Sequence, residues 1–397
     1  MLKAVEVKPD VYWVGVIDWN ERSFDGHAID RGSTYNAYLI LDEHVTLIDT
    51  CKGNFADEML QRIASVVDPS RIEYVIANHG EMDHSGSLPR IMEVAPDACV
   101  VTSDPSGLAC LKGCYGDSFH YMGVKNGDTL CIGKRTLLFT PTVMVHWPDN
   151  MVTYSEYDRI LFSNDAFGQH YTSSGRFDDE VELGVVFEEA KKYYANIVMP
   201  YSKHVVRALK ALEGLEFDMI APSHGIIWRS HIPEIMERYH VWSQAKPQEK
   251  ACVVYDTMYH STAAMALHIA DALEDAGIPT TKFDLTYTTI TDVMTEVMDC
   301  RYVAVGSPTL NKTMLPTVAA FLCAMKGLVC DKGRIGIPFG SYGWITNGPD
   351  EVAEALSTCG YVLPFGTLTQ LWVPTQADLD ALEVTITEGL VRVRAEA

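Results

Sequence analysis

A polar, proline-containing stretch, Ser243–Glu249, divides the chain into two halves with different hydrophobic patterns. This stretch has no apolar period, which is typical of a linker. A chain of 397 residues is long enough for two or three domains. We therefore expect two domains, residues 1–245 and residues 251–397.

The two halves predict two kinds of α/β domain. Before the linker, runs such as Tyr35–Leu41 predict strands, and apolar residues three to four apart in Phe55–Val67 predict a helix. After the linker, five strand-like runs alternate with helical stretches, from Ala251–Tyr255 to a last strand within Tyr361–Trp372. Regular alternation in a domain of this size predicts a doubly wound parallel sheet of flavodoxin size. The first half is expected to be a strand-rich, mixed α/β domain.

The segment His79–His84 holds four potential metal ligands in six positions, directly after the apolar run Tyr74–Ala77. These ligands are His79, Glu81, Asp83 and His84. In a loop, two imidazoles and two carboxylates can turn toward one point, whereas in a regular strand or helix they would face different ways. Burying adjacent carboxylates without a cation is costly, so the cluster favours a metal site.

Three further candidates, His146, Asp165 and His224, each follow an apolar run that predicts a strand. Strand ends at one edge of an α/β domain commonly form ligand sites. Seven ligands exceed the needs of one tetrahedral ion but suit two ions that share a carboxylate. A set of imidazoles and carboxylates without thiolate suits iron, manganese or zinc. A lone histidine such as His44 is more often a packed or surface residue.

These motifs resemble those of the flavodiiron proteins. The hexapeptide fits the family pattern H-x-E-x-D-H, and the segments Leu161–His170 and Ser223–Gly225 are similar to family segments. Across essentially the whole chain, the resemblance implies a metallo-β-lactamase-like αββα domain followed by a flavodoxin-like doubly wound parallel five-stranded sheet. Hydrolases of the same superfamily resemble H-x-H-x-D-H, so Glu81 supplies a harder, anionic ligand that suits iron.

The resemblance also implies how the ligands divide between two iron ions. His79, Glu81 and His146 would hold one iron, Asp83, His84 and His224 would hold the other, and Asp165 would bridge both. Nearby candidates for orienting these ligands or donating protons are Trp147, His170 and either Tyr193 or Tyr194, with Tyr194 preferred. Core packing explains these aromatic residues equally well.

Hydroxyl groups crowd the turn after the first predicted strand of the second half. Thr257, Ser261 and Thr262 can hold a phosphate monoester together with backbone amides at a helix start. A hydroxyl-rich helix start alone is more often a cap, but Gly306–Asn311 and Phe339–Trp344 form turns at the same edge, with glycine and aromatic residues that suit a flat ring. The resemblance implies FMN. The candidate contacts are Thr257, Met258, Tyr259, His260, Ser261, Thr262, Ser307, Pro308, Thr309, Asn311, Ser341, Tyr342, Gly343 and Trp344.

A flavin and two irons together imply a terminal reductase, because a flavin accepts two electrons and releases them singly. The resemblance names two oxidants, dioxygen reduced to water and nitric oxide reduced to nitrous oxide, and we expect dioxygen, with nitric oxide as a second or shared activity. The chain ends shortly after the flavodoxin-like region, so we expect a separate electron donor, rubredoxin or a reduced deazaflavin. The resemblance also implies a head-to-tail homodimer or a dimer of dimers.

The composition limits the kinds of binding partner that we expect. The net charge of −22 disfavours nucleic acid and anionic lipid, and it would repel an acidic electron carrier unless a local basic patch exists. No apolar run reaches the roughly 18 residues that span a bilayer, and the first residues lack a signal-peptide pattern. The ten cysteines are scattered and form no C-x-x-C motif, which disfavours disulfide frameworks and zinc ribbons. We expect a cytoplasmic protein.

Two other functions stay open at this point. The first is a dizinc hydrolase with an accessory flavodoxin-like domain, which predicts colourless metal and activity on esters or lactams. Glu81 counts against it. The second is a non-enzymatic electron carrier with a vestigial metal site, and the complete set of seven ligands counts against that.

Overall fold

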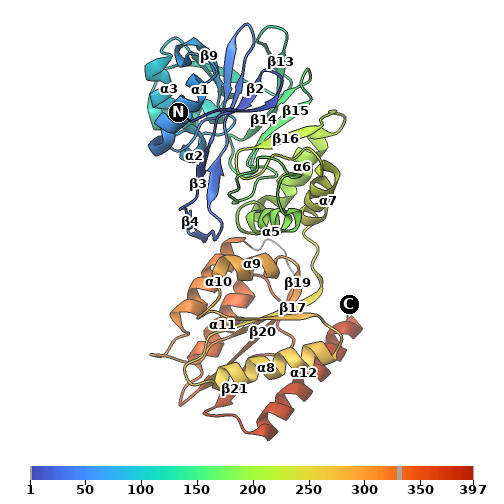
Figure 1. Ribbon diagram of the computed structural model, residues 1–397. Helices are drawn as coiled ribbons and strands as arrows, with labels where there is room; N and C mark the ends of the chain where they lie inside the picture. Colours follow the sequence, from blue (N-terminus) through green and yellow to red (C-terminus); the bar gives the residue numbers. More distant parts are fainter. Residues whose placement is uncertain (1, 329–332, 397) are drawn as a thin grey trace. The chain divides into compact units, whose positions relative to one another are not determined.

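The computed structural model describes residues 2–328 and 333–396, which cluster into two compact units (Figure 1). One unit contains the residues up to Tyr194 together with Tyr201–Gln244, and the other contains Ala195–Pro200 together with the residues from Ala245 onward. Domains of residues 1–245 and 251–397 remain our proposal, with the difference that Ala195–Pro200 cluster with the second unit. No helix in the described part of the chain is long and apolar enough to cross a membrane.

Two sheets form the central layers of the first unit. In spatial order, the seven-stranded sheet contains β1 (Val5–Lys8), β2 (Val11–Trp13), β7 (Tyr38–Ile40), β8 (Val45–Ile48), β9 (Ile72–Ile76), β10 (Cys99–Ser103) and β11 (His120–Val124). The five-stranded sheet contains β12 (Thr129–Cys131), β13 (Thr136–Pro141), β14 (Met151–Ser155), β15 (Ile160–Asn164) and β16 (Met219–Pro222). Two short ribbons pair β3 (Val16–Asp18) with β6 (Ser33–Tyr35) and β4 (Ser23–Phe24) with β5 (His27–Ala28).

Helices cover the outer faces of both sheets, which gives the αββα layers (Figure 1). The helices of this unit are α1 (Ala56–Ala64), α2 (Met82–Ser85), α3 (Leu88–Val94), α4 (Ser106–Tyr115), α5 (Leu183–Tyr193), α6 (Ser202–Leu212) and α7 (Ile232–Ser243). Successive side chains of the central strands point to opposite faces. Leu47 and Val75 therefore pack in the core beneath α1 and α3, whereas Ile48 and Ile76 pack in the core between the sheets.

The second unit is built on one parallel sheet. In spatial order its strands are β18 (Thr280–Asp284), β17 (Gln248–Tyr255), β19 (Cys300–Gly306), β20 (Ile335–Tyr342) and β21 (Leu368–Leu371). Its helices are α8 (Ser261–Asp275), α9 (Ile290–Val297), α10 (Pro316–Leu328), α11 (Asn347–Thr358) and α12 (Gln376–Glu396). Helices α8 and α12 lie on one face of the sheet, and α9, α10 and α11 on the other (Figure 1). The predicted doubly wound, five-stranded parallel sheet is confirmed.

Three local expectations were wrong. Strand β13 ends at Pro141, so Thr142–Val145 forms no strand and His146 lies in a turn. Backbone hydrogen bonds form within the turn, since Val145 N donates to Thr142 O at 2.9 Å. The segment of the hexapeptide from Met82 onward is the short helix α2 instead of an irregular loop. Strand β20 continues to Tyr342, so Ser341 and Tyr342 are strand residues.

A buried ion-pair cluster stabilises the first unit near the start of β15. The Arg135 side chain is fully buried, and its Nε donates to Asp158 Oδ2 at 2.8 Å while Nη1 donates to Asp42 Oδ2 at 3.1 Å. Removing one partner of a buried pair leaves a charge without compensation. The cluster is therefore a sensitive point for stability.

We expect Asp158→Asn to lower the free energy of unfolding by about 3–5 kcal/mol. Urea denaturation followed by circular dichroism measures this change. The control is Asp10→Asn, which removes the exposed ion pair of Asp10 with Lys134 and should leave stability nearly unchanged. Equal stability of the two variants would contradict the structural role of the Arg135 cluster.

Candidate functional site

The structure brings all seven ligand candidates together at one end of the αββα layers. His79 follows β9, Asp165 follows β15 and His224 follows β16. Two groups result, His79, Glu81, His146 and Asp165 in one and Asp83, His84 and His224 in the other, and the ligand atoms within each group lie within 4.8 Å of one another. Strands from both sheets therefore supply the cluster.

Asp165 lies between the two groups. Its Oδ2 is 3.5 Å from His146 Nε2 and 3.8 Å from His79 Nε2. Its Oδ1 is 2.9 Å from His84 Nε2 and 3.5 Å from His224 Nε2. One carboxylate oxygen faces each group, which is the arrangement that a bridging ligand requires.

The electrostatics of the cluster favour cations. Burial alone would keep the rings neutral, but the neighbouring carboxylates outweigh it and raise the pKa of His79 and His146 to about 10. Although burial opposes ionisation of Asp165, His84 and His146 hold the pKa of its carboxyl well below the usual range. Two buried oxygens, Asp83 Oδ1 and Asp165 Oδ2, have no hydrogen-bond partner among the described residues. Four imidazoles, three carboxylates and unsatisfied oxygens fit a dinuclear iron site.

A buried polar network lies directly beneath the ligands. Asp49 accepts hydrogen bonds from the Asn78 backbone N at 2.8 Å and from Asn78 Nδ2 at 3.0 Å. Asn164 Nδ2 donates to Ser223 Oγ at 3.0 Å, and Asn150 Nδ2 donates to Asn164 Oδ1 at 3.0 Å. Asn78, Asn164 and Ser223 each precede a ligand candidate in sequence, and this repeated pattern was a usable signal that our sequence analysis missed.

Asp149 is a second residue that the sequence analysis missed. Its Oδ2 accepts from His79 Nδ1 at 2.9 Å and from the Gly80 backbone N at 2.6 Å. The carboxylate is buried, so it holds a proton on His79 Nδ1 and turns Nε2 toward the cluster, where Nε2 lies 3.0 Å from Glu81 Oε2. No local signal marks Asp149, because its partner lies 70 residues away in the sequence.

Of the adjacent tyrosines, Tyr193 and not Tyr194 reaches the cluster. Tyr193 OH donates to Asp165 Oδ1 at 3.1 Å, whereas Tyr194 OH pairs with Ser202 Oγ at 3.0 Å. Consecutive positions on a helix point in directions about 100° apart, so only one of them can face the ligands. The preference for Tyr194 is therefore corrected.

The other two candidates lie against the ligand rings. His170 is buried, its Nδ1 pairs with Ser33 Oγ at 2.9 Å, and its ring centre lies 5.1 Å from that of His224. Trp147 is 39% exposed, and its ring meets that of His79 edge to face at 5.0 Å. Both can restrict the orientation of a ligand ring.

A cavity of about 440 Å³ opens beside the cluster. Glu81 and Asp83 contribute to its wall, together with the apolar side chains of Phe24 and Met82. Lys52 also lines it, with Nζ 2.9 Å from Glu21 Oε2. A small uncharged molecule can therefore reach the ligands through a partly apolar space.

The three predicted flavin loops meet at one edge of the second sheet. Thr262 Oγ1 lies 2.9 Å from Ser341 Oγ, and the Thr309 backbone N donates to Ser341 O at 3.2 Å. The backbones are so close that a Cβ on Gly340 would lie 1.9 Å from Ser307 O. The start of α8 after β17, the loop after β19 and the end of β20 therefore lie together.

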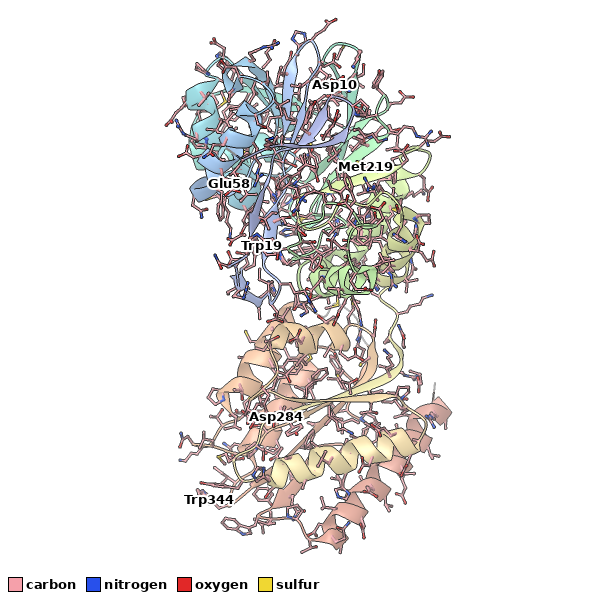
Figure 2. All side chains as sticks on the ribbon, viewed as in Figure 1. Asp10, Trp19, Glu58, Met219, Asp284 and Trp344 are labelled. Atoms are coloured by element: carbon pink, nitrogen blue, oxygen red, sulfur yellow. The ribbon has the colours of Figure 1, made fainter. Side chains whose placement is uncertain are left out.

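The predicted FMN contacts differ in how exposed their side chains are. Thr262, Ser307, Pro308 and Ser341 are buried, and the Thr257 hydroxyl oxygen is buried without a hydrogen-bond partner, which fits the phosphate of a flavin. Tyr259 and Trp344 are 86% and 81% exposed, and Figure 2 shows Trp344 at the periphery of the second unit. The remaining candidates are Met258, His260 and Asn311, which are exposed, and Ser261, Thr309, Tyr342 and Gly343, which are partly buried. The buried hydroxyls suit a phosphate, and the exposed aromatic residues suit the border of a flat ring.

Comparisons with known proteins agree with this architecture. A model described as the ODP family of beta lactamases matches residues 34–225, and a flavodoxin model matches residues 253–383. A nitric oxide reductase of Moorella thermoacetica is 41% identical over 387 residues, 96% of each chain. A rubredoxin-oxygen oxidoreductase of Megalodesulfovibrio gigas is 36% identical over 396 residues, 98% of each chain. The crystal structure of the flavodiiron protein from Giardia intestinalis gives a TM-score of 0.94 at 38% identity and covers 100% of this chain and 98% of that one.

The chain belongs to the flavodiiron protein family. It is an oxidoreductase with a β-lactamase-like domain and a flavodoxin domain. Its cofactors are FMN and a non-heme diiron centre, as the sequence resemblance implied. Family membership favours this function over the dizinc hydrolase.

Asp149→Asn tests the orientation of His79. We expect iron affinity to fall roughly 10- to 100-fold, because a neutral amide holds the ring less firmly than a carboxylate. Iron titration of the metal-free variant measures this, and FMN content should stay at the level of the unmodified protein. The control is Asp128→Asn, which alters an exposed aspartate that also accepts from a backbone N, that of Lys125. Equal iron affinity in both variants would contradict the role of Asp149.

Thr257→Val tests the phosphate end of the flavin site. Loss of one hydroxyl that bonds a charged phosphate should weaken FMN binding roughly tenfold or more, while iron content stays unchanged. Flavin fluorescence titration of the FMN-free protein measures the dissociation constant. Thr387→Val is the matched control, because the Thr387 hydroxyl bonds only within its own helix, to Glu383 O at 2.9 Å. If Thr257→Val binds FMN as tightly as this control, the hydroxyl does not contact the phosphate.

Proposed function

We propose that the protein is a terminal reductase that reduces dioxygen to water, with reduction of nitric oxide to nitrous oxide as a second activity. The observation that carries the proposal is the pair of ligand groups that share Asp165 beside a small cavity. Two relatives are named for the two oxidants, one as a nitric oxide reductase and one as a rubredoxin-oxygen oxidoreductase. We also propose a cytoplasmic location.

In this proposal, the ligands divide as the two groups in the structure suggest. His79, Glu81 and His146 would hold one iron, Asp83, His84 and His224 the other, and Asp165 both. When bound, FMN and the two irons supply electron storage and one-electron transfer. The residues in the three flavin loops, including Thr257, Ser307 and Ser341, would hold FMN.

The side chains of the protein position and shield this chemistry. Asp149 holds the proton of His79 on Nδ1, so that Nε2 faces the cluster. Burial raises the pKa of Tyr193 well above its usual value, so its hydroxyl remains protonated and orients Asp165 as a hydrogen-bond donor. Phe24 and Met82 add apolar surface to a cavity that Lys52, Glu81 and Asp83 also line, so an uncharged diatomic molecule can enter beside the ligand candidates.

Electrons would come from a separate donor, rubredoxin or a reduced deazaflavin. The exposed side chains of Tyr259 and Trp344 offer aromatic surface at the flavin loops, where a donor can approach the ring. The same surface would face the diiron unit of a second copy in a head-to-tail homodimer or a dimer of dimers.

The function is tested first on protein purified without oxygen. We expect about two iron ions and one FMN per chain, together with consumption of dioxygen, and more slowly of nitric oxide, when a reductant is supplied. Elemental analysis, the visible spectrum and gas electrodes measure these quantities.

The variant Asp165→Ala should lose iron and all reductase activity while it keeps FMN, because it removes the shared ligand. Asp158→Asn, which lies outside both sites, should keep both cofactors in its folded fraction. Zinc without iron, together with hydrolysis of esters or lactams, would support the hydrolase instead. Unchanged turnover in Asp165→Ala would contradict the bridging role.

A further inference from the structure

Oxidisable aromatic side chains extend from the Asp165 loop through the interior of the first unit. Tyr193 is the last residue of α5 and Tyr194 follows it, whereas Tyr239 and Trp242 lie in the last turns of α7. The three tyrosines are at most 3% exposed, whereas Trp242 is 8% exposed and its neighbour Val241 is 53% exposed. The cluster therefore runs from the buried ligands toward the surface at the end of α7.

Tyr239, Trp242 and Tyr194 contact one another, and Phe167 links Tyr239 to the Asp165 loop. The Phe167 backbone N, two residues after Asp165, donates to Tyr239 OH at 2.7 Å, and the rings of Phe167 and Tyr239 are 4.4 Å apart. The ring centres of Tyr239 and Trp242 are 5.6 Å apart. Tyr194 packs on both, at 5.2 Å from Tyr239 and 5.3 Å from Trp242. These contacts make a continuous aromatic path.

The fully reduced cofactors hold only as many electrons as the proposed reaction consumes. Reduction of dioxygen to water takes four electrons, and the cofactors hold four, two on FMN and one on each iron. A centre that meets dioxygen before it is fully reduced is left with an oxidising equivalent beside buried histidines. Phenol and indole side chains are the ones that most readily give up a single electron without losing a bond in the ring.

We propose that Tyr239 and Trp242, with Tyr194 packed against both, form an electron relay that removes such oxidising equivalents from the Asp165 site. Tyr239 passes one electron to the site and its phenol proton to water, and Trp242 then returns one electron to Tyr239, which takes up a proton from water again. The net loss is one electron and the indole Nε1 proton of Trp242, and this proton passes to water. A low-molecular-weight thiol then reduces the indole radical. The relay rests on the proposed function only for the source of the oxidant.

Substitution by phenylalanine separates the relay from simple packing. Phenylalanine keeps the ring that fills the core, but it is not oxidised under these conditions. Tyr239→Phe and Trp242→Phe therefore test the relay. Tyr154→Phe is the matched control, since Tyr154 is a buried tyrosine of the five-stranded sheet whose hydroxyl donates to Glu216 O at 2.6 Å.

The experiment uses the protein loaded with iron and FMN and adds hydrogen peroxide as the oxidant, so that it does not depend on dioxygen turnover. Rapid freezing with electron paramagnetic resonance detects organic radicals, and peptide mass spectrometry locates oxidised residues. We expect a radical and oxygenation at Trp242 in the unmodified protein and in Tyr154→Phe. In Tyr239→Phe, oxidation of Trp242 should fall several-fold and appear instead on the ligand histidines and on Met82. In Trp242→Phe, the radical should remain on tyrosine.

Several results would overturn the relay. The first is that Trp242 is not oxidised in the unmodified protein. The second and third are that Trp242 is oxidised to the same extent in Tyr239→Phe, or in protein without iron, as in the unmodified protein. Oxygen uptake by the same preparations with reductant tests the proposed function separately. Oxidation of Trp242 by peroxide without oxygen uptake would overturn the proposed function and support the relay, whereas uptake without oxidation of Trp242 would overturn the relay alone.

Discussion

The metal centre depends on the buried polar contacts of Asp49. This carboxylate holds Asn78, at the end of a strand of one sheet, and lies 3.4 Å from the amide Nδ2 of Asn164, at the end of a strand of the other. Buried amides and carboxylates must keep their partners, so the two sheets cannot shift without a large loss of hydrogen bonding. His79 and Asp165 are the next residues in the chain. The network that satisfies the strand ends therefore also sets the positions from which the ligands extend.

The grouping of these ligand candidates could be predicted from the sequence, because three of them follow strands. His79, Asp165 and His224 each come one to three residues after an apolar run, and parallel or aligned strands bring such positions to a common edge. The fold of the second domain could also be predicted from the sequence, since few architectures other than a doubly wound parallel sheet fit a regular alternation of buried strands and helices. Its flavin loops meet because the sheet order places β17 and β19 side by side.

The parts that could not be predicted depend on contacts between distant segments. His146 lies in a turn whose backbone bonds internally, although the apolar run before it has the composition of a strand. Asp149 becomes meaningful only when the fold brings it to His79. The choice between Tyr193 and Tyr194 depends on the rotation of α5 about its axis, and two neighbouring tyrosines give no sequence signal for that rotation.

The ligand candidates differ in how deeply they are buried, so one side of the centre is more exposed than the other. The side chains of Glu81 and His146 remain 18% and 14% exposed, whereas those of Asp83, Asp165 and the other three histidines are at most 4% exposed. Glu81 and Asp83 both line the cavity, so a molecule that enters it can reach both groups, and the group containing Glu81 is the more exposed of the two. At this position the similar hydrolases carry a histidine. A carboxylate is a harder, anionic ligand than an imidazole, so in the proposed ligand set Glu81 would stabilise the higher oxidation state of the iron that it holds. In the proposed ligand set, this one ligand change at the more exposed side of the site would favour electron transfer over hydrolysis on a scaffold of the same kind.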